Sequence, residues 1–257
     1  MFEPRLALAS LSGSSDSAWA RAGVPMAGAA FIGGIAVCEQ TREAAKAMAQ
    51  RDREEFLPDN PIAFIERQLG ALEGVKIRAG VNVRSIDTTA TRRVANLCAA
   101  HDAIYEVNAH CRQIEMCSVG AGETLLTDPD ALVEQVKTAS STGVDVSVKV
   151  RAEIPEVDLV EIAQLIETAG GGAIHVDAMD TRDIVRDIVD ATDLFVIANN
   201  GIRSRADVGE YMSYGADAVS VGRASDRPVV LKRIADAIGA SDDVIGDEAR
   251  VPNRNDR

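Results

Sequence analysis

Reactive and cationic side chains gather near the middle of the chain, just past the ends of two successive apolar segments. Asn108 and Cys111 follow the first segment, and Lys149 and Arg151 close the second. A thiol is mostly protonated at neutral pH, so a cysteine in this place can act as a general acid as well as a nucleophile. A lysine ammonium beside it can stabilise negative charge on a bound ring. Taken singly, a cysteine is more often a small buried hydrophobe, and a lysine can lie along the surface in a salt bridge.

Only one of the two cationic residues is expected to face this site, because Lys149 and Arg151 are expected to point to opposite sides of their strand. Lys149 is the better candidate, since it extends the series Val144, Val146 and Val148 to the strand end. His175, one of three histidines, lies in a later apolar segment and is a further candidate for the site. The alternative is a histidine of the core whose hydrogen bonds are satisfied there.

Two glycine-containing turns late in the chain indicate an anion site. The first holds Asn200, Gly201 and Ile202, and the second holds Gly222 and Arg223. Backbone N–H groups in such turns, together with the start of a following helix, form a cradle for phosphate. One glycine turn could be explained by steric reasons alone, but two such turns with Arg223 as counter-charge favour a phosphate-bearing ligand. The competing ligands are a sugar phosphate and a flavin mononucleotide.

The elements that must position these residues alternate between strand and helix eight times, with no linker and no break in composition. The expected strands cover residues 5–11, 29–37, 75–83, 103–108, 144–150, 173–176, 193–198 and 217–221. This alternation predicts a parallel sheet with right-handed crossovers. Eight units in this length favour a single (β/α)₈ barrel over an open doubly wound sheet, and such barrels carry their chemistry at the carboxyl ends of the strands. We expect the barrel to span residues 1–240 and the polar tail, residues 241–257, to be disordered.

The composition narrows the class of protein further. The 257 residues include 27 basic and 40 acidic side chains, a net charge of −13, and no apolar run has the length of a membrane span. The acidic excess counts against a large nucleic-acid footprint and suits a salt-rich cytoplasm, in which salt screens self-repulsion. Met1 to Arg5 lack the features of a signal peptide, and the four cysteines show no paired metal spacing. A reduced, cytoplasmic protein without a metal is therefore expected.

Taken together, the motifs resemble those of the FMN-dependent tRNA-dihydrouridine synthases and their dihydroorotate dehydrogenase-like relatives. Residues 8–16 (Leu-Ala-Ser-Leu-Ser-Gly-Ser-Ser-Asp) look like the family's Leu-Ala-Pro-Met-Ala-Gly-Val-Thr-Asp, residues 108–111 like Asn-x-Gly-Cys, and residues 148–151 like Val-Lys-Ile-Arg. Gly122 with Leu125 and Leu126 has the family's Gly-x-x-Leu-Leu spacing. The two late glycine turns stand where the family has Asn-Gly-Asp-Ile and Gly-Arg. The resemblance covers nearly the whole barrel.

This resemblance implies a flavoprotein oxidoreductase that reduces the C5=C6 bond of a uracil ring. FMN would supply the hydride and Cys111 the proton, while Asn108 would position the substrate or the flavin ring. Lys149 would touch the pyrimidine edge of the flavin, and Asn82 stands near the family's flavin-binding glutamine. The resemblance further implies tRNA as the substrate and tRNA processing as the role, with NAD(P)H as a candidate electron donor.

The chain departs from the family pattern in several places, including Ser10 and Leu11 where the family has Pro-Met. The motif Gly-Cys-Pro is replaced by His110, Cys111 and Arg112, and the family's histidine position falls on either His175 or Asp177. The chain resembles a short, archaeal-type form without the C-terminal helical domain that grips tRNA. Two alternatives therefore stay open: a flavin dehydrogenase for a free, dihydroorotate-like pyrimidine, and a flavin-free phosphate-binding barrel.

Overall fold

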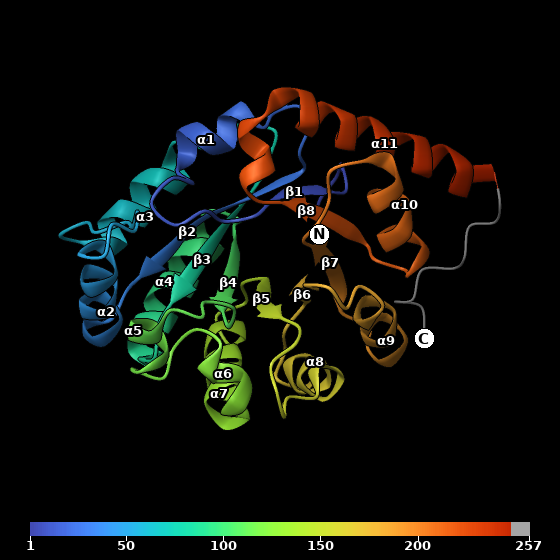
Figure 1. Cartoon of the computed structure of the whole chain (residues 1–257). Helices are drawn as coiled ribbons and strands as arrows, with labels where there is room; N and C mark the ends of the chain where they lie inside the picture. The colour runs from blue at the N-terminus through green and yellow to red at the C-terminus, as the bar shows by residue number, and fades with distance from the viewer. Residues whose placement is uncertain (248–257) are drawn as a thin grey trace.

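Eight parallel strands close into a barrel in the computed structural model, which describes residues 1–247 (Figure 1). The strands are β1 (Leu6–Leu8), β2 (Ala29–Ala36), β3 (Arg78–Arg84), β4 (Ile104–Asn108), β5 (Val146–Arg151), β6 (Ala173–Asp177), β7 (Phe195–Asn199) and β8 (Ala218–Val221). Each strand pairs with its neighbours in the chain, and the register of Leu6 with Val219 and of Ala7 with Ser220 closes the barrel between β1 and β8. The predicted (β/α)₈ barrel is thus confirmed.

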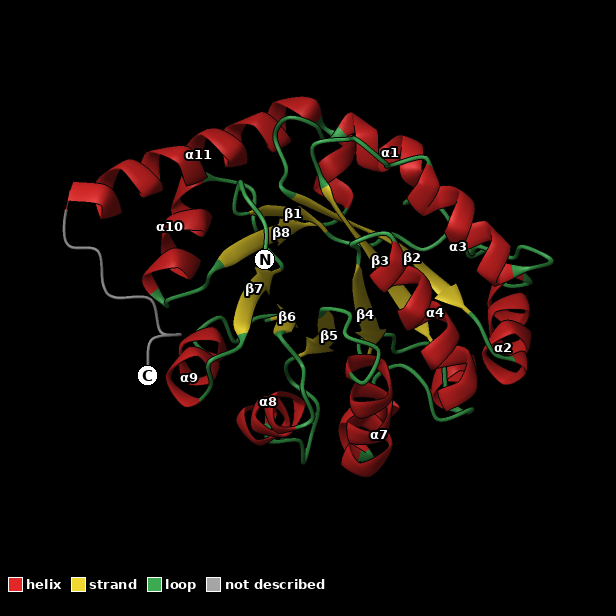
Figure 2. Ribbon diagram, turned by 180° about the vertical axis from the view of Figure 1, so that it is seen from behind, coloured by secondary structure: helices red, strands yellow, loops and turns green. Residues whose placement is uncertain are grey.

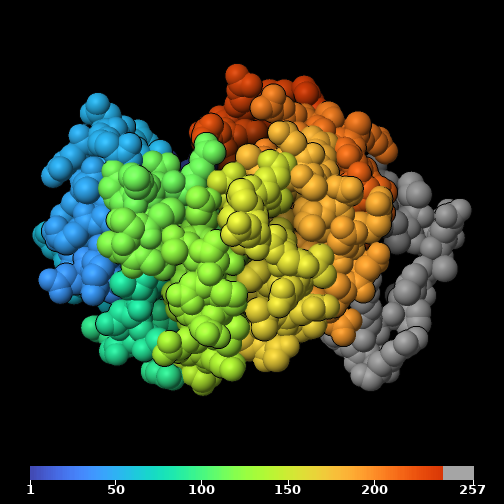
Figure 3. Space-filling view, turned by 60° about the horizontal axis from the view of Figure 1, so that its bottom comes forward, coloured from blue at the N-terminus to red at the C-terminus, as the bar shows by residue number. Residues whose placement is uncertain are grey.

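Helices form an outer ring around the strands (Figure 2). They are α1 (Ser17–Ala22), α2 (Glu39–Ala49), α3 (Pro61–Gly70), α4 (Thr88–Ala100), α5 (Ile114–Cys117), α6 (Thr124–Thr127), α7 (Pro129–Ser140), α8 (Leu159–Thr168), α9 (Ile184–Ala191), α10 (Arg205–Ser213) and α11 (Pro228–Asp247). A 3₁₀ turn, η1 (Arg223–Asp226), precedes α11. In the space-filling view the segments follow one another around the barrel in chain order (Figure 3).

Local sequence explains where several helices begin. Asn60 and Asp128 each precede a proline, and their side chains accept hydrogen bonds from the N–H groups of Ala63 and Ala131 at 3.0 and 3.2 Å. A capping acceptor followed by proline is a strong start signal, because it satisfies one free N–H group and fixes the first helical φ angle. The last helix runs to Asp247, beyond the boundary expected at residue 240, and the rest of the expected tail lies outside the described residues.

Side chains inside the barrel change from apolar to polar along the strands. At the amino-terminal end, a small cluster of Phe31, Ile104, Ile197 and neighbouring alanines fills the interior. The larger apolar cluster lies between the strands and the surrounding helices. Nearer the carboxyl ends, the inward positions carry polar residues instead, and these form the floor of the site described below. None of the described helices is long and apolar enough to cross a membrane.

Candidate active site

Two adjoining cavities open at the carboxyl ends of the strands. The first, of about 390 Å³, lies between the end of β1 and the turns after β7 and β8. The second, of about 290 Å³, lies between the end of β1 and the segment after β4. Five residues line both cavities, so the two form one continuous cleft; they are Ser10, His110, Lys149, Asp177 and Arg223. The cleft occupies the edge of the barrel at which chemistry is expected.

The turn after β7 presents unpaired backbone donors to the first cavity. The N–H groups of Gly201 and Ile202, and of Gly222 in the neighbouring turn, have no hydrogen-bond partner within the described part of the chain. Asn200 and Gly201 both have positive φ angles, 92° and 69°, so the chain turns sharply after β7. Free N–H groups at the edge of a cavity can bind an anion. Phosphate binding at these two turns stays a prediction.

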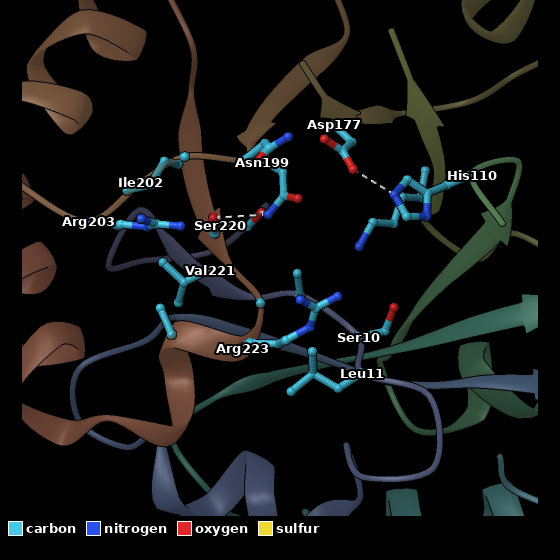
Figure 4. Close-up of a pocket in the computed structure, with 16 residues that line it drawn as sticks. Ser10, Leu11, His110, Asp177, Asn199, Ile202, Arg203, Ser220, Val221 and Arg223 are labelled. Carbon is cyan, nitrogen blue, oxygen red and sulfur yellow. Dashed lines mark hydrogen bonds and ion pairs between the residues drawn. The ribbon is translucent and has the colours of Figure 1, made fainter. Parts of the chain in front are cut away.

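Two side chains hold this turn in place from beneath. The Tyr211 hydroxyl donates to the carbonyl of Asn200 at 3.1 Å, and Arg182 packs over the Tyr211 ring. The guanidinium of Arg182 also bonds to Glu210 and lies 3.5 Å from the carbonyl of Gly201. These contacts occupy the carbonyl groups of Asn200 and Gly201. Arg223 reaches from the turn after β8 into the same cavity (Figure 4).

Cys111 lies in a loop that is fixed to the end of β4. The Asn108 Oδ1 atom accepts hydrogen bonds from the backbone N–H groups of Cys111 at 2.9 Å and of His110 at 3.3 Å. Gly122 packs against the loop from the other side: a side chain on this glycine would bring its Cβ within 2.2 Å of the Cys111 carbonyl oxygen. Cys111 lines the second cavity, and the residue is 8% exposed.

His110 bonds to Asp177 across the cleft rather than to Cys111. Its Nε2 atom lies 2.7 Å from Asp177 Oδ2 (Figure 4). Burial lowers the pKa of His110 below its usual value, despite the opposing effect of Asp177. Burial acts against ionisation of Asp177, but the hydrogen bond from His110 and its charge outweigh it, so the pKa of Asp177 is also lowered. The pair therefore joins the ends of β4 and β6 above Lys149.

A buried polar network lies beneath both cavities. Asn108 donates to Asn82 at 2.7 Å, and Asn82 donates to Glu106 at 2.7 Å. From the other side, Asn199 donates to Ser220, which lies 2.7 Å from His175, and His175 lies 2.8 Å from Glu106. The network thus runs from the Cys111 loop to the end of β7 and converges on one carboxylate.

The charge states within this network follow from burial and partners. Burial opposes ionisation of Glu106, but attraction to His175 and Lys149 and its hydrogen bonds outweigh it, and its pKa is lowered. Burial lowers the pKa of His175, which favours its neutral form. We therefore assign the Nδ1–H of neutral His175 as the donor to the Glu106 carboxylate, with Ser220 donating to its Nε2 atom.

Lys149 is the cation at the centre of the cleft. Its side chain is 4% exposed, and its ammonium has no hydrogen-bonded acceptor among the described residues. Burial lowers the pKa of Lys149, while the charges of Glu106 and Asp177 oppose that effect. An ammonium with free donors at the junction of two cavities is placed to contact a ligand that enters either of them.

One expectation about β5 is wrong. Arg151 lines the second cavity together with Lys149, because residues two apart on a strand face the same side. The neighbouring Val148 and Val150 belong to the apolar layer between strands and helices. Lys149 therefore faces the cleft as predicted, but it does not continue the valine series. Arg151 is held by Glu123 at 2.8 Å, which leaves Lys149 as the unpaired cation of the strand.

The other predicted residues divide into two layers. Asn108 and Cys111 line the second cavity, and the residues of the two glycine turns line the first; these are Asn200, Gly201, Ile202, Gly222 and Arg223. Asn82 and His175 are fully buried in the network below and line neither cavity. Of the two candidates on β6, it is Asp177 that faces the cleft. Contact of Asn82 or His175 with a cofactor stays a prediction.

Sequence interpretation missed Glu106 and Ser220 altogether. The alternation of side chains along a strand could have identified Glu106, because residues two apart face the same side. Glu106 is two residues before Asn108, and His175 is two residues before Asp177. A charged residue at an inward position of a buried strand needs partners, which points to a network.

Comparison with known proteins adds a family and a fold. A sequence model described as dihydrouridine synthase (Dus) matches residues 80–251, which is most of the chain. The chain is also 28% identical over 234 residues to an uncharacterized protein of Methanocaldococcus jannaschii, covering 86% of this chain and 89% of that protein.

Solved structures share the barrel at low sequence identity. A mandelate oxidase mutant with a C4a-OH-FMN adduct matches with a TM-score of 0.59 and 18% identity, over 91% of this chain and 74% of that one. A mutant tryptophan synthase alpha-subunit from Pyrococcus furiosus matches with a TM-score of 0.60 and 13% identity, over 93% of this chain and 100% of that one. A FabK mutant from Thermotoga maritima matches with a TM-score of 0.57 and 15% identity. The match covers 86% of this chain and 61% of that one. At this identity the likeness shows the fold alone.

Proposed function

The chain belongs to the dihydrouridine synthase family, and from that premise we propose that it is an FMN-dependent oxidoreductase that reduces the C5=C6 bond of a uracil ring. One observation carries the proposal. The unpaired, buried ammonium of Lys149 lines both cavities, with free N–H groups on one side of it and Cys111 on the other. A cofactor phosphate, a cofactor ring and a substrate ring each have a suitable neighbour in this cleft.

The residues of the first cavity fit the cofactor. The free N–H groups of Gly201, Ile202 and Gly222, with Arg223 above them, would hold its phosphate. Lys149 would place positive charge beside the ring and so favour the reduced, anionic form. When bound, FMN supplies the hydride for the ring carbon.

The residues of the second cavity fit the proton transfer. The Cys111 thiol would give its proton to the other carbon of the double bond, so that one hydride and one proton convert the C=C bond to a CH–CH bond. Asn108 acts as a positioning residue, because it fixes the backbone that carries the thiol. Solvent would return the proton to the thiolate. We propose NAD(P)H as the electron donor that restores the reduced cofactor.

An absorption spectrum with added FMN tests the cofactor first. Purified protein should show the visible bands of a bound flavin, and the reduced flavin should be reoxidised by a uracil-containing substrate under anaerobic conditions. Colourless protein with no affinity for FMN would remove the redox function and leave the first cavity as a phosphate site. Bound flavin that no uracil compound reoxidises would retain the flavoprotein and reject the substrate class.

A further inference from the structure

The second cavity is cationic in a chain that is strongly acidic. Six cationic side chains line it, and Asp177 is the only carboxylate among its lining residues; the cations are Arg53, Arg84, Arg112, Lys149, Arg151 and Arg223. The whole chain has a net charge of −13. Positive charge concentrated in a cavity against an anionic background selects an anionic ligand.

Arg84 carries a hydrogen-bond donor without an acceptor. The side chain is 3% exposed, its Nη1 atom bonds to Glu55 at 2.5 Å and its Nη2 atom to the Ser12 hydroxyl at 2.6 Å. The Nε–H is buried and has no acceptor among the described residues. A buried donor without a partner costs free energy. The unpaired Nε–H of Arg84 in the cavity wall therefore indicates a partner that is not part of the chain.

Gly34 packs against this donor. A Cβ atom on Gly34 would lie 2.9 Å from Arg84 Nε and 2.8 Å from Asn82 Oδ1. Gly34, Ser12 and Arg84 all line the second cavity. The Nε and Nη2 atoms form the edge of a guanidinium that binds carboxylate or phosphate with two parallel hydrogen bonds. On this edge Nη2 donates to the Ser12 hydroxyl, and the Nε–H has no acceptor among the described residues.

Arg112 supplies a second cation that is free to bind. It is exposed, lies beside Cys111, and has no acidic partner among the residues that the structure describes. Two arginines near this cavity are already paired: Arg51 with Glu115 at 2.5 Å and Arg151 with Glu123 at 2.8 Å. Arg112 therefore differs from these two arginines in having its charge free for a ligand.

We propose that the second cavity binds a carboxylate or phosphate carried by a small pyrimidine, with the Nε–Nη2 edge of Arg84 and the guanidinium of Arg112 as the binding groups. An anion held there places the attached ring beside Cys111, which lines the same cavity. A polynucleotide would need a row of free cations outside the cavity, and the acidic excess of the chain, a net charge of −13, counts against such a row. This inference rests on the proposed function, because it names the substrate class of the same cleft.

The test is calorimetric titration of the FMN-bound protein with three pyrimidines. Orotate carries a carboxylate on the ring, uridine monophosphate carries a phosphate on the ribose, and uracil carries neither. We expect at least one of the two anions to bind about tenfold or more tightly than uracil, since each charge-assisted contact contributes on that scale. The anion that binds more tightly identifies the source of the charge. Equal affinity for all three, or displacement of both anions by a tighter-binding tRNA, would overturn the proposal.

Matched variants locate the effect. Arg112→Gln, at an exposed position, should weaken the anion about tenfold and leave the affinities for uracil and FMN unchanged. Arg84→Lys keeps a charge for Glu55 but removes the two-donor edge, and it should cause a similar loss. Arg93→Gln makes the same charge change at an exposed site on α4 and should change nothing. If Arg112→Gln binds the anion as tightly as Arg93→Gln, the proposal is wrong.

The same titrations separate this inference from the proposed function. Protein that does not bind FMN contradicts the proposed function, yet titration of the chain alone with orotate and uridine monophosphate still tests the anion site. Protein that binds FMN but prefers uracil to both anions keeps the proposed function and overturns this inference.

Discussion

The Nδ1 atom of His175 lies 2.8 Å from the Oε2 atom of Glu106, and both side chains are fully buried beneath the cleft. Glu106 also accepts from Asn82 and Ser147, so three donors from β3, β5 and β6 converge on one carboxylate. The carboxylate holds the floor of the cleft together, and its charge lies near Lys149. The floor, the Cys111 loop and the β7 turn are therefore one hydrogen-bonded unit.

Replacement of Glu106 should destabilise the whole barrel. Glu106→Gln puts an amide donor against residues that are themselves donors, and it leaves Lys149 without its buried counter-charge. Each buried donor that is left without an acceptor costs roughly 1–3 kcal/mol. Urea unfolding should therefore show a lower midpoint, whereas Glu134→Gln on the exposed face of α7 should leave it unchanged. Equal midpoints for both variants would mean that Glu106 is not ionised.

Stability should fall as the pH drops below neutrality. The pKa values of His110, His175, Glu106 and Asp177 are all lowered in the folded chain, the histidines by burial and the carboxylates by their partners, which outweigh burial. The unfolded chain then binds protons at higher pH than the folded chain does, so acid favours unfolding. Stability should decline first below about pH 6.5, where free histidine titrates, and again below about pH 4. Unfolding free energies measured across this range check the sign, and a maximum below pH 5 would contradict it.

Strand and helix order were predictable because each element carries its own local signal. The segment around Val146 alternates apolar residues, and Asp128 with Pro129 marks a helix start. These signals depend on residues close together in the chain, and the structure places every predicted strand within a few residues of its expected bounds.

The floor of the cleft was not predictable in the same way, because its partners come from distant strands. Glu106 and His175 are 69 residues apart in the chain and meet only once the barrel closes. Arg84 and Ser12 are 72 residues apart, and no local pattern links them. The alternation of side chains along a strand could have shown that Glu106 faces inward together with Asn108. It could not have shown which side chain Glu106 would contact.

Loss of the Cys111 thiol should separate cofactor binding from proton transfer. Cys111→Ala removes the proposed proton donor but keeps the backbone N–H that Asn108 holds, so FMN should still bind. Anaerobic reoxidation of the reduced flavin by substrate should fall by at least about a hundredfold, the usual scale of general acid catalysis. Stopped-flow absorbance provides the measurement. Cys98→Ala, in the core between strands and helices, is the control for loss of a thiol as such. Unchanged reoxidation in Cys111→Ala would assign the proton to another group.

The acidic surface should make stability depend on salt. With a net charge of −13, self-repulsion destabilises the folded chain, and the screening length falls from about 8 Å at 0.15 M salt to about 3 Å at 1 M. The free energy of unfolding should therefore rise between these two concentrations of potassium chloride. An uncharged osmolyte at equal osmolality controls for solvent exclusion. A stability that is greatest at low salt would reject the expected adaptation to a salt-rich medium.

A methyl group at Gly201 should weaken cofactor binding. Gly201 has a φ angle of 69°, and a Cβ atom there would lie 2.5 Å from Arg182 Nη2. Gly201→Ala would therefore strain the turn and displace the guanidinium that supports it, so its N–H groups would no longer converge. We expect FMN affinity to fall about tenfold or more, measured by quenching of flavin fluorescence.

Gly209→Ala is the matched control, because a Cβ atom at this position on α10 meets nothing within 4 Å. It should keep full affinity and gain up to about 1 kcal/mol of stability, since alanine favours a helix over glycine. Equal affinity in the two variants would show that the turn after β7 does not hold the phosphate.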